Sequence, residues 1–275
     1  MHLGVALFVS DLSSDVRDVA RACEDLGFES FWVPEHTHIP VSRATPYPAG
    51  GDLPPEYARI FDPFLTLTAA AVVTERLRLG TGVCLVVERD PIHLAKETAT
   101  LDVLSGGRLI LGVGGGWNVE EMTSHGADPA KRWSIVRDRL DLVRKLWTQE
   151  VAEHDGPYAK LEPSWQWPKP VQRPHIPIHV GGDGPIAMKH AAAYGDGWMP
   201  IPDKRRGSMT DRIAQLATFA AEAGRPMPEV TAYACTPKRE VVEHYASIGV
   251  ARCVFNLPPT GDAVAALKQI AGVVM

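Results

Sequence analysis

The chain alternates between short runs of apolar residues and longer stretches in which apolar residues recur every three or four positions. The short runs are typical of buried strands, and the longer stretches are typical of helices with one buried face. Strands are predicted over His2–Val9, Phe28–Val33, Leu77–Cys84, Arg108–Val113, Ile176–Val180, Gly197–Met199, Val230–Cys235 and Arg252–Leu257. Helices are predicted over Ser13–Leu26, Phe61–Thr74, Ile92–Leu104, Ile135–Trp147, Pro185–Tyr194, Ser208–Ala223, Lys238–Ile248 and Asp262–Ile270.

Eight strands that are each followed by a helix predict an α/β fold, a single (β/α)8 TIM barrel that forms one domain over residues 1–275. Capping residues support several helix boundaries. Ser13 or Ser14 is placed to cap the first helix. Asp62 is placed to cap the second helix, and Pro63 follows it in the first turn, where a missing N–H group does no harm.

Two segments interrupt this alternation. The extended loop over residues 35–60 follows the second strand and contains IPVSRATPYPAGGDLPP. Because barrel enzymes place their sites at the carboxyl ends of strands, we interpret this loop as a cover for an active site. The insertion over residues 149–175 precedes the fifth barrel strand, and VAEHDGPYAKL within it predicts a hairpin. Surface decoration and a functional role both remain open for the insertion.

The composition of the chain argues against nucleic acids and membranes as binding partners. The formal net charge is −5, and Lys204-Arg205-Arg206 is a short basic run of the kind found in solvated loops, so nucleic acid is not the expected partner. The apolar runs are too short to span a membrane, and the N-terminal stretch lacks the features of a signal peptide. The four cysteines are widely spaced without a C-x-x-C pair, which favours a reducing cytoplasm.

Glycines gather where three predicted strands end, in LGTGV, LILGVGGGWN and HVGGDG. Glycine permits close approach of the backbone to a flat or phosphorylated ligand. The second stretch is not a dinucleotide fingerprint, because Trp117 stands where G-x-G-x-x-G needs its third glycine. It is not a phosphate loop either, because no lysine follows the glycines. We interpret the clustered glycines as one rim of a ligand site.

The third glycine stretch is the better candidate for a phosphate site. Gly181 and Gly182 leave a strand, and Pro185 opens a helix whose first N–H groups favour an anion. Asp183 is an awkward neighbour for a phosphate, although its carboxylate is also placed to cap that helix.

His36 is the leading candidate for acid–base chemistry, and Glu35 stands beside it at the end of the second strand. The alternative is a histidine held in a structural hydrogen bond. The pair His36-x-His38, with His179 on a later strand, also raises the possibility of a metal-dependent barrel hydrolase. Against that possibility, the pair follows the second strand instead of lying on the first, and no matching histidine lies on the sixth strand or aspartate on the eighth, so no metal is predicted.

Four separated motifs resemble one family. WVPEH, LRLGTGV, KETATLDVLSGGRLILGVGGGWNVEE and PKPVQRPHIPIHVGGDGPIAMKHAAAYGDGWMP occur in the order found in the luciferase-like monooxygenase superfamily. They look most similar to its branch that uses the deazaflavin coenzyme F420. The resemblance covers most of residues 1–202, whereas the remainder agrees only in its alternation of strands and helices.

The resemblance implies a homodimeric barrel with an isoalloxazine or deazaflavin ring at its mouth. It implies a non-prolyl cis peptide bond at Gly82–Val83 behind the ring, a phosphate site at Gly181 and Gly182, and His36 facing the reactive edge of the ring. With the rim glycines and their neighbours, the predicted cofactor-binding residues are Thr81, Gly82, Val83, Gly114, Gly116, Trp117, Gly181, Gly182, Asp183, Gly184, Gly197 and Trp198. His36 and Glu35 are the predicted catalytic residues.

One departure from the family limits what the resemblance implies. Some F420-dependent dehydrogenases carry a proton-donating glutamate directly after the glycines of the fourth strand, where this chain has Trp117 followed by Glu120 and Glu121. Sugar-phosphate dehydrogenase activity is therefore not expected. The sequence predicts an F420-dependent oxidoreductase that exchanges hydride with a small organic substrate. The alternatives are an FMN-dependent monooxygenase and a cofactor-binding protein without turnover.

Overall fold

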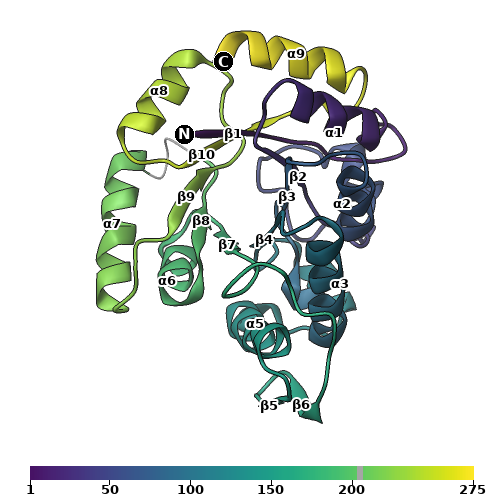
Figure 1. Cartoon of the computed structure of the whole chain (residues 1–275), viewed down its shortest axis with the longest axis vertical. Coiled ribbons are helices and arrows are strands. Elements are labelled where there is room, and N and C mark those ends of the chain that lie inside the picture. Colours follow the sequence, from purple (N-terminus) through teal and green to yellow (C-terminus); the bar gives the residue numbers. More distant parts are fainter. Residues whose placement is uncertain (203–206) are drawn as a thin grey trace.

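The fold is a closed barrel of parallel strands, described over residues 1–202 and 207–275 of a computed structural model (Figure 1). The strands follow the barrel order β1-β10-β9-β8-β7-β4-β3-β2, so that β1 closes the ring by pairing with β10. Their bounds are β1 His2–Ala6, β2 Ser30–Val33, β3 Arg78–Thr81, β4 Leu109–Val113, β7 Ile178–Gly181, β8 Gly197–Met199, β9 Glu229–Ala232 and β10 Arg252–Asn256. The predicted TIM barrel is confirmed.

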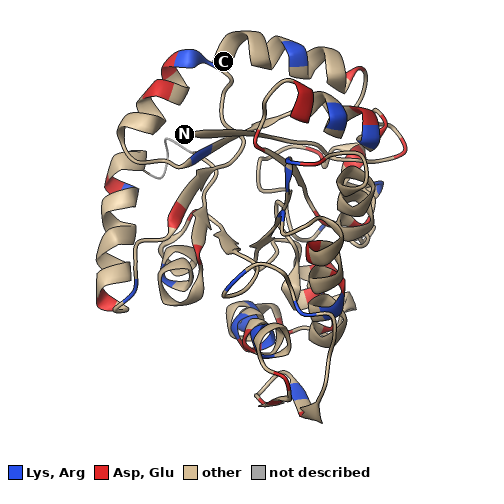
Figure 2. Cartoon of the chain, in the orientation of Figure 1, with Lys and Arg blue, Asp and Glu red and all other residues tan. Residues whose placement is uncertain are grey.

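Helices surround the barrel and connect its strands. Their bounds are α1 Val16–Asp25, α2 Pro63–Ala71, α3 Pro91–Leu104, α4 Val119–Ser124, α5 Arg132–Thr148, α6 Pro185–Tyr194, α7 Met209–Glu222, α8 Arg239–Ser247 and α9 Ala263–Val274. Short 3₁₀ turns lie at Pro55–Ala58, Val86–Glu88 and Pro129–Lys131. Figure 2 shows acidic and basic residues interspersed along these helices, whereas most of the barrel strands carry no charge.

The predicted boundaries hold with local corrections. Asp15 caps α1, with its carboxylate accepting the Arg17 N–H, so the prediction of Ser13 or Ser14 as the cap is wrong. Asp62 caps α2 as predicted, by accepting the N–H groups of Phe64 and Leu65. The six-residue helix α4 was not predicted, because it is too short to show a clear helical period.

The insertion before β7 contains the predicted hairpin. Its antiparallel strands are β5 Ala152–Asp155 and β6 Lys160–Ser164, and they lie beyond α5 at the edge of the molecule (Figure 1). The basic run at residues 204–206 lies outside the described residues. Over residues 1–202 and 207–275, no helix is both long and apolar enough to cross a lipid bilayer.

The barrel interior is filled by side chains, and two glycines make room for them. Trp32 lies fully buried inside the barrel, in a cluster with Ala6, Ile110, Met199 and Val254. A Cβ atom at Gly80 would lie 2.2 Å from the Trp32 ring, and one at Gly112 would lie 1.9 Å from the Thr81 carbonyl oxygen. These glycines of the rim motifs therefore serve close packing between strands.

Candidate active site

A cavity of about 520 Å³ opens at the carboxyl ends of the barrel strands. Its size falls in the usual range for a small-molecule site. All eight barrel strands contribute to it, either through their last residue or through residues that follow them, as is usual for a TIM-barrel site. The lining residues are Phe8, Pro34, Glu35, His36, Tyr47, Tyr57, Gly82, Val83, Leu85, Gly114, Gly115, Gly116, Trp117, Arg132, Trp133, Gly181, Gly182, Asp183, Met199, Ile201, Tyr233, Ala234 and Asn256.

The rim glycines close around one side chain on the cavity wall. A Cβ atom at Gly114 would lie 2.5 Å from Val83 Cγ2, and one at Gly181 would lie 2.6 Å from Val83 Cγ1. Val83 therefore fits between β4 and β7 only because both neighbours lack side chains. The peptide bond between Gly82 and Val83 is cis, as the family resemblance implied.

Some of the residues that were predicted to bind a cofactor line the cavity, and others do not. Those that line the cavity are Gly82, Val83, Gly114, Gly116, Trp117, Gly181, Gly182 and Asp183. Thr81, Gly184, Gly197 and Trp198 do not line it. Thr81 instead donates from Oγ1 to the Gly112 carbonyl oxygen at 2.7 Å. Trp198 is buried and donates from Nε1 to the Gly182 carbonyl oxygen at 2.9 Å, so it holds the glycine turn from behind.

Gly197 and Asp183 also make contacts that the sequence did not reveal. Gly197 packs under the His179 ring, because a Cβ atom there would lie 2.6 Å from the imidazole. Asp183 does not cap α6, whose cap position is Gly184. The Asp183 carboxylate accepts the Ile201 N–H at 2.7 Å and lies 3.3 Å from the Arg212 guanidinium. Arg212 thereby offsets the negative charge that made Asp183 an awkward neighbour for an anion.

His36 lies on the cavity wall between two polar partners. Its Nδ1 is 2.6 Å from Oε2 of Glu121, which is fully buried on α4. Trp117 donates from its indole Nε1 to His36 Nε2 at 3.3 Å. Because an indole N–H can only donate, these contacts select the neutral tautomer with its proton on Nδ1. His36 therefore presents a basic nitrogen on the cavity side and is oriented by a carboxylate behind it.

Aromatic side chains surround His36. Tyr57 lies beside the imidazole with ring centroids 5.4 Å apart, and its hydroxyl is 3.0 Å from that of Tyr47. Both tyrosines come from the loop over residues 35–60, and Tyr47 also contacts the Trp117 ring. Glu120 anchors this loop by accepting the Thr45 N–H at 2.8 Å. The loop that the sequence pointed to as a cover thus supplies part of the cavity wall.

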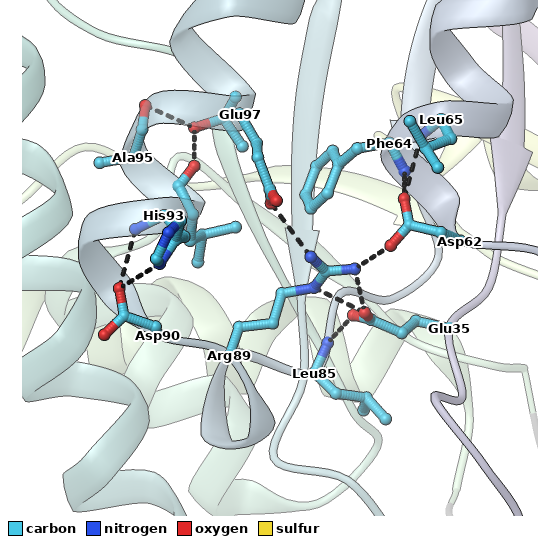
Figure 3. A network of polar contacts seen from close by, with 12 residues as sticks. Glu35, Asp62, Phe64, Leu65, Leu85, Arg89, Asp90, His93, Ala95 and Glu97 are labelled. Carbon is cyan, nitrogen blue, oxygen red and sulfur yellow. Dashed lines mark hydrogen bonds and ion pairs between the residues drawn. The ribbon is translucent and has the colours of Figure 1, made fainter.

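Glu35 forms a buried ion pair with Arg89 (Figure 3). Its Oε2 accepts the Leu85 N–H at 2.6 Å, and its Oε1 accepts from Arg89 Nε at 2.6 Å. The same guanidinium contacts Asp62 at 2.6 Å and Glu97 at 3.0 Å. The Glu35 carboxylate thus ties the end of β2 to the segment after β3, and its role in catalysis stays a prediction.

The histidines considered for a metal site do not come together. His179 is buried inside the barrel, where burial and then the Arg252 charge lower its pKa to about 3. His38 is exposed, and its Nδ1 is 2.9 Å from the Thr37 hydroxyl. No group of three or more histidine, cysteine or acidic side chains suited to a metal ion occurs within residues 1–202 and 207–275.

The sequence analysis missed several residues of this site. Arg132 and Trp133 reach the cavity from the start of α5, and Arg132 donates to the Gly116 carbonyl oxygen at 2.9 Å. Tyr233 and Asn256 line it from the ends of β9 and β10. Glu121 was noted only as a neighbour of Trp117. The available signal was the pair of acidic residues after Asn118, which is typical of the first turn of a helix.

A closed barrel with a cavity at the carboxyl ends of its strands is the arrangement found in TIM-barrel enzymes. The sequence comparison identifies the family within this class. Residues 10–244 match the family described as luciferase-like monooxygenase. The chain therefore belongs to the luciferase-like monooxygenase family, whose members are oxidoreductases or monooxygenases.

Two relatives illustrate the range of similarity. An uncharacterized protein of Mycobacterium tuberculosis (strain ATCC 25618 / H37Rv) is 44% identical over 278 aligned positions, which cover 98% of each chain. The F420-dependent glucose-6-phosphate dehydrogenase of Amycolatopsis mediterranei is 30% identical over 219 positions, which cover 78% of this chain and 61% of that enzyme.

Solved structures agree with the fold. The monooxygenase RslO1 from Streptomyces bottropensis superposes with a TM-score of 0.82 at 21% identity, covering 99% of this chain and 98% of that one. An F420-dependent secondary alcohol dehydrogenase, solved in complex with an F420–acetone adduct, gives 0.76 at 19% identity, covering 100% and 98%. At these identities the likeness establishes the shared barrel.

Proposed function

We propose that this protein is an F420-dependent oxidoreductase that exchanges a hydride with a small organic substrate above the barrel mouth. The observation that carries the proposal is the placement of His36 Nε2 on the wall of the glycine-lined cavity, with Glu121 fixing the opposite nitrogen at 2.6 Å. This arrangement supplies a base next to a largely apolar cavity. The preference for F420 over FMN rests on relatives such as the Amycolatopsis enzyme.

The residues of the cavity fit such a cofactor. Gly114 and Gly181 flank Val83 and leave a surface without protruding side chains, which suits a planar ring. At one side, Gly182 precedes the first turn of α6, whose N–H groups favour a phosphate. Arg132 adds a positive charge at the rim of the cavity. When bound, the deazaflavin would accept or supply the hydride.

The chain itself would handle the proton that accompanies the hydride. In the direction of alcohol oxidation, His36 Nε2 would take the hydroxyl proton while the carbinol hydrogen leaves with the electron pair of its C–H bond as hydride. Trp117 must then yield its hydrogen bond with Nε2 to the substrate hydroxyl. Glu121 stabilises the imidazolium that forms, because its carboxylate already faces Nδ1. Tyr47 and Tyr57 would exclude water from above.

Turnover tests this proposal directly. The purified protein is mixed with oxidised F420 and a panel of small secondary alcohols, or with reduced F420 and the matching carbonyl and enone compounds. We expect a change in deazaflavin absorbance with at least one pair, and transfer of deuterium from the labelled carbinol carbon to the cofactor. Oxygen consumption with reduced FMN instead would favour the monooxygenase. A protein that binds cofactor but is inert towards the panel would be a binding protein without turnover.

The predicted homodimer and the cytoplasmic location remain predictions. Two exposed apolar side chains, Leu65 on α2 and Val72 directly after it, are 75% and 73% accessible in the single chain. Sedimentation of the purified protein would measure the oligomeric state.

A further inference from the structure

A line of buried acidic groups leads from His36 away from the substrate cavity. Glu121, which accepts the Nδ1 proton of His36, is completely buried. Its other oxygen, Oε1, accepts the Thr37 N–H at 3.0 Å. The two oxygens of the carboxylate thus accept two hydrogen bonds, which the single acceptor oxygen of a glutamine could not do. A carboxylate can in addition take up a proton.

Glu88 continues the line beyond Glu121. Its side chain is 1% exposed, and its Oε2 makes no hydrogen bond to any residue of the described chain. Burial, and next the charge of the adjacent Glu121, raise the pKa of Glu88 to about 9. The Glu35 carboxylate also contributes to this rise in the pKa, whereas Arg89 opposes it. Glu88 therefore carries a proton near neutral pH, beside a carboxylate that does not contact solvent.

The line ends at a second cavity. This cavity has a volume of about 360 Å³, and Glu88, His125, Arg139, Tyr158 and Lys160 contribute to its wall. None of its lining residues also lines the substrate cavity. His125 Nε2 lies 3.9 Å from Glu88 Oε2 and 2.7 Å from the Thr37 hydroxyl. The His125 side chain is 28% exposed, so the chain of titratable groups reaches solvent there.

We propose that Glu121 and Glu88 form a proton route that connects His36 to solvent in this second cavity. The inference rests on the proposed function, because the route serves a His36 that exchanges a proton with substrate. Such a route is needed when cofactor and substrate fill the front cavity and separate Nε2 from water. The route works in both directions of hydride transfer.

The proton balance is simple in the direction of alcohol oxidation. Nε2 gains the substrate proton, and Nδ1 releases its own proton to Glu121. Glu121 passes this proton to Glu88, and the proton that Glu88 held leaves to His125 or to solvent in the second cavity. Glu121 and Glu88 are then in their starting states and one proton has crossed from one cavity to the other, whereas His36 now carries its proton on Nε2 instead of Nδ1. When product release opens the front cavity to water, Nε2 loses this proton to water and Nδ1 takes one back from Glu121, supplied through Glu88 from the second cavity, which restores the starting tautomer.

The first test uses the protein without cofactor, so that it does not depend on catalysis. Protein labelled with ¹⁵N-histidine is used to measure exchange of the His36 Nδ1 proton with solvent by NMR. We expect Glu88→Gln to slow this exchange ~10-fold or more, because the route is cut one group behind Glu121. The matched control is Glu97→Gln, a carboxylate that contacts Arg89 but lies off the route. An unchanged exchange rate in Glu88→Gln overturns the proposal.

The dependence of the melting temperature on pH tests whether Glu88 is protonated in the folded protein. The native protein keeps this proton up to about pH 9, whereas in an unfolded chain the pKa of Glu88 has its ordinary value of 4.5. The unfolded state therefore binds fewer protons between these values, and the stability contribution of Glu88 falls as pH rises. The groups facing Glu88 are Glu121, Glu35, His125, Arg89 and Arg139. We expect Glu88→Gln to melt higher than wild type at pH 8, with a smaller gain at pH 5; equal gains would overturn the proposal.

Catalysis provides a separate readout. Once a substrate is found, Glu88→Gln should leave hydride transfer in the first turnover intact and slow steady-state turnover ~10-fold. Proton release to a pH indicator should lag behind hydride transfer in this variant. A variant in which both steps slow equally contradicts a route. If wild type shows no turnover, the proposed function fails, and the exchange measurement still decides whether the route exists.

Discussion

Replacing His36 with alanine is expected to lower turnover ~10²-fold or more while leaving cofactor affinity nearly unchanged. The reason is geometric: Nε2 is the basic nitrogen on the cavity wall, and Glu121 holds the ring in place from behind at 2.6 Å. Losing the imidazole removes proton transfer, whereas the glycine surface around Val83 stays as it is. Steady-state rates and fluorescence titrations of the cofactor on both proteins measure the two quantities.

The neighbouring His38 offers a matched control. It stands two positions further along the same loop, is exposed, and does not line the cavity. His38→Ala should therefore keep its turnover within about twofold of wild type, as expected for a surface substitution. Turnover that survives in His36→Ala would remove this histidine from the mechanism. Equal losses in both variants would point to loop distortion instead.

The largest effect on stability is expected for Arg89→Met. The guanidinium is 13% exposed and contacts Glu35, Asp62 and Glu97, which come from three separate parts of the chain (Figure 3). Its removal leaves the Glu35 carboxylate, 1% exposed, without a counter-charge. Breaking a buried pair on one side costs about 3–5 kcal/mol. For a chain of this size the melting temperature should fall by roughly 10 °C, measured by calorimetry.

Two further variants separate charge burial from general damage. The double change Arg89→Met with Glu35→Leu should recover part of the loss, because no uncompensated carboxylate remains. Arg76→Met removes an arginine that is 75% exposed and 4.0 Å from Glu24, and it should change stability by less than ~0.5 kcal/mol. A loss below ~1 kcal/mol in Arg89→Met would contradict the account of Glu35 as a structural anion.

The barrel was predictable because the spacing of apolar residues within each segment distinguishes strands from helices. The apolar positions in this pattern are those that become buried in the fold. The count of eight strand–helix units then indicates a closed barrel. Helix α4 shows where this signal ends: six residues cover less than two turns, so no period can form. The cap of α1 was misplaced because Ser13, Ser14 and Asp15 all suit the cap position, and only the backbone path selects Asp15.

The site was predictable in outline but not in its contacts. The glycine motifs correctly indicated the rim, yet Gly80 and Gly112 proved to serve Trp32 and the adjacent strand. Glu35 and His36 are neighbours in sequence, and the chain turns them towards different partners, an arginine and a second glutamate. A partner such as Glu121 is 85 positions from His36, and no local pattern encodes a pairing at that separation.

The most direct test of the account is a titration of the purified protein with F420 and, separately, with FMN, followed by fluorescence. The account predicts that F420 binds with a Kd below ~100 μM, at least ~10-fold more tightly than FMN, a difference of about 1.4 kcal/mol. Tighter binding of FMN would move the protein to the flavin-dependent side of its family. Failure of both cofactors to bind below ~100 μM would contradict the claim that the glycine-lined cavity is a flavin or deazaflavin site.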